Sequence, residues 1–185
     1  MRSVIYSIGV SLDGFVAGPN GEIDWSAPDE QLHRFHNEQT KELGVELCGR
    51  RLYEVMLPWE SDDPSAGEPE REFARLWQNL PKIVFSTTLD RVEGNARLAT
   101  DGIAAEVAKL KEQPGKDIAV GGPTLAASFA ELDLIDEYRQ FVSPVVLGGG
   151  TPYFPPLPNR LDLELLETRT FGSGVVYLRH RRARV

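Results

Sequence analysis

The chain has 185 residues, a length that fits one domain spanning residues 1–185. Hydrophobic residues make up 41% of it and charged residues 26%, so the composition excludes a collagen-like, a disordered and a small disulfide-rich protein. Lys and Arg number 20 against 28 Asp and Glu, and the net charge of −8 argues against a nucleic-acid backbone as the main partner.

Cysteine usage and the N-terminus bear on the compartment. Cys48 is the only cysteine, so the chain cannot form an internal disulfide, which favours a reducing compartment. His33 and His36 are close in sequence, but no further ligands have the spacing of a metal site, and we predict none. The apolar stretch near the N-terminus is too short for a signal sequence or a membrane span. These observations predict a cytoplasmic protein that does not contact a membrane.

The first half of the chain predicts strands that alternate with helices. Residues 3–10 form a nearly continuous apolar and β-branched run, which is typical of a strand buried on both faces. After glycine-rich turns we expect a helix to about residue 43, with Ser26 as its N-cap and Pro28 in its first turn. A strand over 45–48 and a short helix over 50–56 follow. Residues 58–69 predict an exposed loop, and 70–79 a helix.

The second half continues the alternation and ends differently. We expect strands over 82–86, 96–99, 117–120 and 135–142, and helices over 103–112 and 123–132, the latter with a proline at its start. Residues 148–150 are three glycines and predict a mobile loop. Residues 161–170 and 175–181 flank a glycine-containing turn and indicate a hairpin. The sequence therefore predicts an α/β protein with a largely parallel sheet and an antiparallel ending.

Polar and glycine-rich loops follow four of the predicted strands, at residues 11–14, 49–52, 86–88 and 121–124. Ligands of open parallel sheets bind outside the carboxyl ends of the strands, so these loops carry the most weight. Their free backbone amides, hydroxyls and guanidinium groups suit a polyanionic ligand, and two of them lead into helix N-termini. None has the lysine of a P-loop or the G-x-G-x-x-G spacing of a Rossmann site.

Structural alternatives remain for these loops. Gly121 and Gly122 are equally explained by a tight strand-to-helix turn that needs a positive φ angle. Arg50 has the alternative role of a surface helix residue.

Three residues near the first strand are candidates for contact with a substrate. Asp13 could hold a substrate amino group or relay a proton, or it could be the first residue of an Asp-Gly turn. Trp25 could close over a bound ring or anchor a loop to the core. Glu30 could face a cleft or complement the dipole of its helix.

Several segments share their order and spacing with one known group of proteins. They are S-L-D-G-F-V-A (11–17), D-W (24–25), G-R-R-L-Y-E (49–54), K-I-V-F-S (82–86), D-I-A-V-G-G (117–122) and P-V-V-L-G-G (144–149). In these segments the chain resembles the dihydrofolate-reductase-like superfamily. The likeness is to small bacterial proteins similar to the C-terminal reductase domain of the bifunctional riboflavin-biosynthesis deaminase-reductase.

This resemblance implies an eight-stranded, mainly parallel sheet with an antiparallel C-terminal strand and helices on both faces. It also implies NADPH as cofactor and a cis peptide between Gly121 and Gly122. The cofactor's phosphate would lie at the loop after the second strand, its 2′-phosphate end at the loop after the third, and its pyrophosphate and nicotinamide at the glycine turn. The residues concerned are Gly49, Arg50, Arg51, Leu52, Ser86, Thr87, Gly121, Gly122, Pro123, Thr124 and Leu125.

The implied activity is hydride transfer from NADPH to a pterin-like substrate or one of the 5-amino-6-(ribosylamino)uracil type. Asp13 and Glu30 would be catalytic, and with Trp25 they would bind the substrate, although Glu30 matches the acidic residue of folate reductases imperfectly. The zinc-binding deaminase domain of the riboflavin enzyme has no counterpart in this chain. A different class of function, a non-catalytic NADP(H)-binding protein on the same fold, stays open. Relatives of this kind pair through the C-terminal region, so we expect a homodimer with the arginine-rich final strand at the contact.

Overall fold

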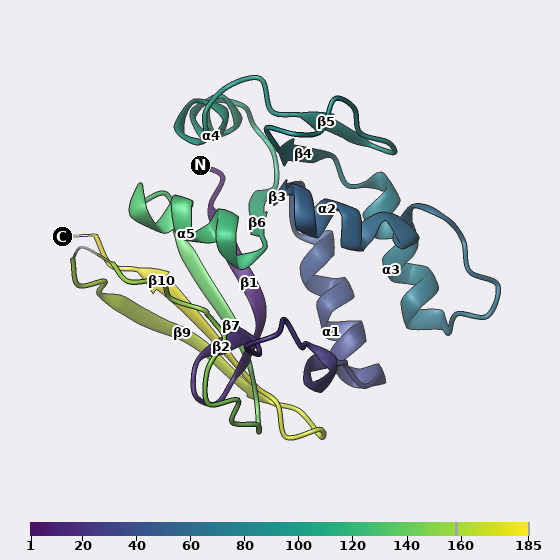
Figure 1. Ribbon diagram of the computed structural model, residues 1–185, viewed down its shortest axis with the longest axis vertical. Coiled ribbons are helices and arrows are strands. Elements are labelled where there is room, and N and C mark those ends of the chain that lie inside the picture. Colours follow the sequence, from purple (N-terminus) through teal and green to yellow (C-terminus); the bar gives the residue numbers. More distant parts are fainter. Residues whose placement is uncertain (158, 185) are drawn as a thin grey trace.

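One eight-stranded sheet forms the centre of the computed structural model, which describes residues 1–157 and 159–184 (Figure 1). From β5 to β7 all neighbouring strands run parallel, and β10 runs antiparallel to both β7 and β9. The order across the sheet is β5 (Ala96–Leu98), β4 (Lys82–Phe85), β3 (Leu43–Gly49), β6 (Asp117–Gly121), β1 (Val4–Ser11), β7 (Glu137–Ser143), β10 (Val176–Arg182) and β9 (Leu163–Thr170). The predicted sheet is confirmed.

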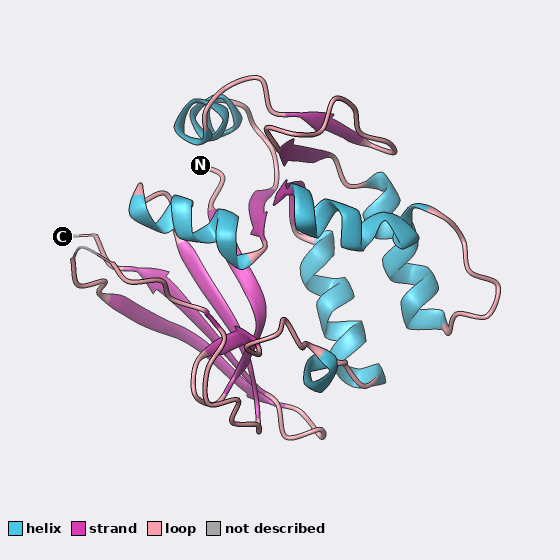
Figure 2. Ribbon diagram, in the orientation of Figure 1, coloured by secondary structure: helices cyan, strands magenta, loops and turns pink. Residues whose placement is uncertain are grey.

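Helices cover both faces of this sheet (Figure 2). On one face, α4 (Ile103–Glu112) and α5 (Pro123–Glu131) pack against Val4, Tyr6 and Val10 of β1 in the main hydrophobic core. The other face, which carries alternate residues of β1, lies under α1 (Glu30–Lys41) and α3 (Glu68–Asn79). α2 (Arg50–Met56) follows β3. Because β1 is covered on both faces, its apolar run is nearly unbroken.

The first helix begins later than the sequence predicts. Ser26 belongs to a 3-10 turn, η1 (Asp24–Ser26), and its hydroxyl donates to the carbonyl of Ile23. Asp29 is the N-cap instead, since its carboxylate accepts from the backbone N–H of Leu32 at 2.8 Å. The cause is Pro28, because the residue before a proline avoids the helical region. The helix also ends at Lys41, two residues short of the predicted end.

Other differences are small. α3 begins at Glu68, so the exposed loop before it is shorter than predicted. The first residues of that predicted loop belong to a second 3-10 turn, η2 (Leu57–Glu60). A second sheet, which the sequence did not predict, consists of the two strands β2 (Phe15–Ala17) and β8 (Thr151–Pro152). No peptide bond among the described residues is cis, so the expected cis bond after Gly121 is wrong.

The C-terminal hairpin places β9, not the arginine-rich β10, at the edge of the sheet. The arginines are held in ion pairs within the chain: Arg179 with Glu137, Arg181 with Glu164, Arg182 with Asp133 and Arg184 with Asp136. Their clustering in sequence therefore reflects pairing with nearby acidic side chains. Within residues 1–157 and 159–184, no helix combines the length and apolarity needed to cross a membrane.

Candidate functional site

Three of the four predicted loops meet at one edge of the sheet. β3 lies between β4 and β6, with Cys48 opposite Gly121 and Gly49 opposite Phe85. The loops that begin at Gly49, Ser86 and Gly121 are therefore neighbours, as the carboxyl ends of adjacent parallel strands must be.

A hollow of about 550 Å³ lies between two of these loops. Arg50, Ser86, Thr87 and Thr88 line it, and the guanidinium group of Arg50 donates to the hydroxyl of Thr88 at 3.2 Å. Asp101 also lines this hollow, and its carboxylate pairs with Lys109. Hydroxyl and guanidinium donors around an open hollow suit a phosphate group.

The glycine turn after β6 is tightly packed. Gly122 has a φ angle of +86°, so the structural interpretation of this residue is confirmed. A Cβ atom at Gly121 would clash with Oε1 of Glu46 and Cδ2 of Leu52. Leu52 thus packs beside the turn.

α5 starts directly after this turn, with Pro123 as its first residue. Thr124 is exposed, whereas the side chain of Leu125 packs against the main core. The free N–H groups of the first turn of α5 therefore face the edge where the loops meet. Arg51, also exposed, lies on the first turn of α2.

Asp13 holds a loop rather than standing free. Its carboxylate accepts hydrogen bonds from the hydroxyl of Ser11 at 2.6 Å and from the backbone N–H groups of Leu147 at 3.1 Å and Gly148 at 2.7 Å. These hydrogen bonds lower the pKa of Asp13 to about 2, and the bond from Ser11 has the largest effect. Two bonds from the glycine-rich loop to one carboxylate argue against the free motion predicted for residues 148–150.

Asp13 is also distant from the glycine turn. Tyr6 of β1 lies opposite Val120 of β6, and β6 ends one residue later while β1 continues to Ser11. The end of β1 thus lies about 13 Å beyond the level of Gly121, at about 3.3 Å per residue. The catalytic role of Asp13 stays a prediction, and this geometry favours the alternative of a structural turn.

Of the other two substrate candidates, Glu30 is exposed and Trp25 is half-buried. Glu30 pairs with Arg34 one helical turn later at 2.8 Å, and its side chain is 71% exposed. The indole N–H of Trp25 donates to the carbonyl of Glu22 at 3.1 Å. The structure does not bring either residue together with Asp13.

A cavity of about 560 Å³ lies between the sheet and the two helices α1 and α3. Small side chains on β1 create it, because Ser7 and Gly9 leave space where larger residues would fill the layer. The sheet contributes Ile5, Ser7, Gly9, Glu46, Ala119 and Arg139. Sequence analysis missed Glu46 and Arg139, although a charged residue inside an otherwise apolar strand is a detectable signal.

The helices supply an aromatic wall to this cavity. Phe73 and Trp77 of α3 line it together with Trp59 of η2 and with His33 and His36 of α1. Burial, with a smaller contribution from His33, lowers the pKa of His36 to about 4, so this imidazole is neutral at pH 7. The aromatic side chains of this cavity suit a planar ring.

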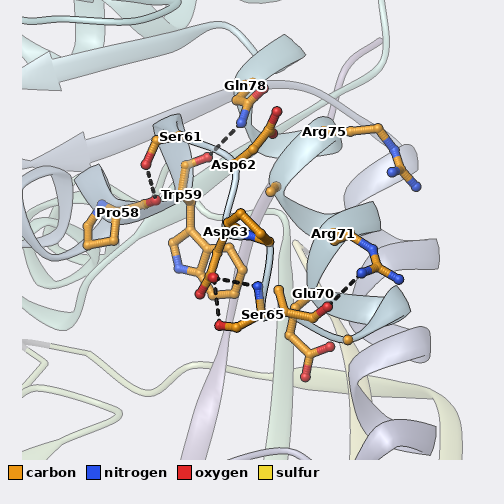
Figure 3. A pocket seen from close by; sticks show the side chains of 14 residues that line it. Pro58, Trp59, Ser61, Asp62, Asp63, Ser65, Glu70, Arg71, Arg75 and Gln78 are labelled. Carbon is orange, nitrogen blue, oxygen red and sulfur yellow. Dashed lines mark hydrogen bonds between the residues drawn. The ribbon is translucent and has the colours of Figure 1, made fainter.

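A further hollow, of about 700 Å³, lies between the loop after η2 and the outer side of α3 (Figure 3). Its polar groups bond to one another: Asp63 accepts from Ser65, and Gln78 donates to the carbonyl of Trp59. None of the strand-end loops lines it, so it is a feature of the exposed loop.

The family model described as the RibD C-terminal domain matches residues 2–177. The chain belongs to the RibD C-terminal domain family. One relative is the uncharacterized protein YyaP of Bacillus subtilis (strain 168). It is 39% identical over 182 residues that cover 96% of this chain and 93% of YyaP.

Two solved structures share the fold of this RibD-like chain. A putative riboflavin biosynthesis protein from Shewanella sp. PV-4 superposes with a TM-score of 0.78 at 23% identity, covering 100% of both chains. The deaminase/5-amino-6-(5-phosphoribosylamino)uracil reductase of Thermotoga maritima gives a TM-score of 0.69 at 18% identity, covering 98% of this chain but 57% of that one. The RibD-like chain therefore has a reductase-type fold.

Proposed function

We propose that this chain is an NADPH-dependent reductase. The observation that carries the proposal is the convergence of three strand-end loops beside a cavity of about 560 Å³ that a second molecule can fill. Membership in the RibD C-terminal domain family supports a reductase of the riboflavin-biosynthesis type.

The residues at the sheet edge fit a phosphorylated dinucleotide. Arg50 and the hydroxyls of Ser86 and Thr87 suit the adenosine 2′-phosphate, and the N–H groups at the start of α5 suit the pyrophosphate. A side chain at Gly121 would collide with Glu46 and Leu52, so glycine keeps the turn after β6 in its present packing beside both side chains. When bound, NADPH would supply the hydride.

The cavity fits a planar heterocycle, pterin-like or of the 5-amino-6-(ribosylamino)uracil type. Phe73, Trp77 and Trp59 offer aromatic surface, and Ser7 and Gln39 offer hydrogen-bonding groups near the floor and wall. The protein's part is to align this ring with the cofactor and to exclude water.

Purified protein tests the proposal in two steps. Calorimetric titration should detect tighter binding of NADPH than of NADH, and absorbance should then report oxidation of NADPH with a pterin or ribosylaminouracil substrate. Binding without turnover on any of these substrates would favour a non-catalytic NADP(H)-binding protein. Absence of binding would reject both functions.

A further inference from the structure

Glu46 is a carboxylic acid in the middle of a central strand. The residue is 9% exposed, and its neighbours Val45 and Leu47 are buried apolar side chains. It lies opposite Ala119 of β6, and both residues line the cavity beneath α1 and α3. An ionised carboxyl group in such a position lowers the stability of the fold unless it is paired, so an unpaired one is expected to be neutral.

The carboxyl group of Glu46 has no partner within the described ranges. No hydrogen bond or ion pair joins it to another group of residues 1–157 and 159–184. Lys82 lies directly opposite it on β4, but the ammonium group of Lys82 donates to the carbonyl of Trp77 at 2.7 Å and pairs with Glu60 at 2.8 Å. The natural counter-ion of Glu46 is therefore engaged elsewhere.

Glu46 also touches the glycine turn. Its Oε1 atom occupies the space that a Cβ atom of Gly121 would need. The same carboxyl group thus contacts the end of β6 and faces the cavity, which places it between the two parts of the proposed site.

Several other titratable or charged groups face this region, and each is occupied or inert. They are Cys48 on β3, Lys82 on β4, His33 and His36 on α1, Glu70 on α3 and Arg139 on β7. Burial raises the pKa of Cys48 to about 12 and lowers that of His36 to about 4, so both are neutral at pH 7.

The remaining groups are paired. Arg139 is bonded to Glu137, and His33 lies 3.8 Å from Glu70, whose side chain is 42% exposed. Glu46 is thus the buried acid of the cavity that has no partner among the described residues.

We propose that Glu46 donates the proton to the substrate in the reductase site. This inference rests on the proposed function. Hydride adds to the carbon of a C=N or C=O bond of the substrate while NADPH is oxidised to NADP⁺. The heteroatom takes the proton of Glu46, and the resulting carboxylate is reprotonated from solvent.

The protonation state of Glu46 suits this role. Burial raises the pKa of Glu46 to about 8, and the Lys82 ammonium opposes the rise only in part. The carboxyl group therefore carries a proton at neutral pH, and an acid with a pKa near the working pH is an efficient proton donor.

Proton release on cofactor binding tests the inference without turnover. If the nicotinamide lies at the glycine turn, the positive ring of NADP⁺ stabilises the carboxylate of Glu46, whereas the neutral ring of NADPH does not. Calorimetry at pH 7 in two buffers of different ionisation enthalpy should show release of up to about one proton per NADP⁺ bound, and little for NADPH. Glu46→Gln should abolish the difference between the nucleotides.

Glu38→Gln is the matched control, because Glu38 is an exposed carboxylate on α1 that pairs with Lys41. It should release protons as the parent does. Equal release by the parent and Glu46→Gln would overturn the inference while leaving the reductase proposal intact, whereas absence of binding by both nucleotides would overturn both.

A measurement on the parent protein alone covers the case in which Glu46→Gln fails to fold. Proton release with NADP⁺ should rise from acidic pH, pass through a maximum and disappear above pH 8, where the free protein has already lost the proton. Release that does not vary with pH in this way would reject Glu46 as the source.

Discussion

The carboxylate of Asp13 accepts a hydrogen bond from the backbone N–H of Gly148, 135 residues later in the chain, at 2.7 Å. A second bond, from the N–H of Leu147, makes the contact bidentate across the two oxygens. Asp13 thereby ties the loop after β1 to the loop after β7, and both loops border the small β2–β8 sheet.

Replacing Asp13 by Ala should release this loop. The N–H groups of Leu147 and Gly148 lose their acceptor, so we expect faster hydrogen exchange at these two amides, with little change in the core strands. Asp13→Asn keeps one acceptor and should have an intermediate effect. Exchange followed by mass spectrometry measures both variants. Unchanged exchange in Asp13→Ala would show that the loop is held by other contacts.

The Asp13→Asn variant also decides the catalytic role predicted for Asp13. If the carboxylate relays a proton, Asp13→Asn loses turnover on a substrate that the parent accepts, while NADPH binding is retained. Undiminished turnover would end the catalytic role and leave Asp13 as a turn residue.

Replacing Arg50 by Ala should weaken NADPH binding by about 1.5–3 kcal/mol, the usual worth of hydrogen bonds to a charged group. NADH lacks the 2′-phosphate, so its affinity should change little. Titration calorimetry with both nucleotides measures the difference. Arg75→Ala serves as control, because Arg75 is an exposed arginine of α3 that pairs with Glu68 away from the strand ends. Equal losses for NADPH and NADH would reassign Arg50 to the shared diphosphate or to structure.

Replacing Asp101, which lines the same hollow as Arg50, should have the opposite effect on NADPH affinity. Its carboxylate lines the hollow with Arg50, and a second negative charge there opposes a bound phosphate. Asp101→Asn should therefore tighten NADPH binding a few-fold, and the gain should shrink as salt screens the charges. Weaker binding would indicate that the ion pair with Lys109 shapes the hollow.

The fold was predictable because, along most of the chain, apolar runs and the glycines and prolines that end them indicate the same element boundaries. The β1 run, Gly121-Gly122 before Pro123, and the glycine turn of the final hairpin each marked an element correctly. Asp29 was missed as the cap because a proline one residue earlier outweighed the Ser26 pattern.

The candidate site was only half predictable. Residues that follow strands, such as Arg50 and Ser86, are adjacent in sequence to the strand ends, so parallel topology brings them together. Glu46 and Arg139 lie inside strands, and their meeting in a cavity depends on which strands are neighbours and which face each residue occupies. That information becomes available only with the sheet order.

We propose that two copies of the chain pair along β9. This strand is the edge of the sheet, and Leu165 and Leu166 on it are 53% and 39% exposed. Sedimentation velocity at micromolar concentration should show a dimer, and Leu165→Glu should shift it toward monomer. A parent protein that sediments only as monomer would refute the pairing. Arg182 of β10 pairs with Asp133, which lies outside β9, so Arg182→Ala should leave the dimer intact.

The stability of the protein should depend on pH through Glu46. The ordinary pKa of this carboxyl is 4.5 and burial raises it to about 8, so between these values the folded protein keeps a proton that the unfolded chain has lost. The free energy of unfolding must then fall as pH rises through this window, by at most about 1.4 kcal/mol per pH unit.

Glu46→Gln has no proton to lose at this position, so it should not show this decline. Relative to the parent, the variant should gain stability steadily from pH 5 to pH 8, while the matched Glu38→Gln variant should follow the parent. Denaturant unfolding at a series of pH values measures the differences. A buried carboxyl group that lowers stability at neutral pH is expected at a functional site, because such sites often give up stability for activity. Parallel curves for Glu46→Gln and the parent would show that Glu46 is ionised in the folded protein, and the proton-donor role would fall with that result.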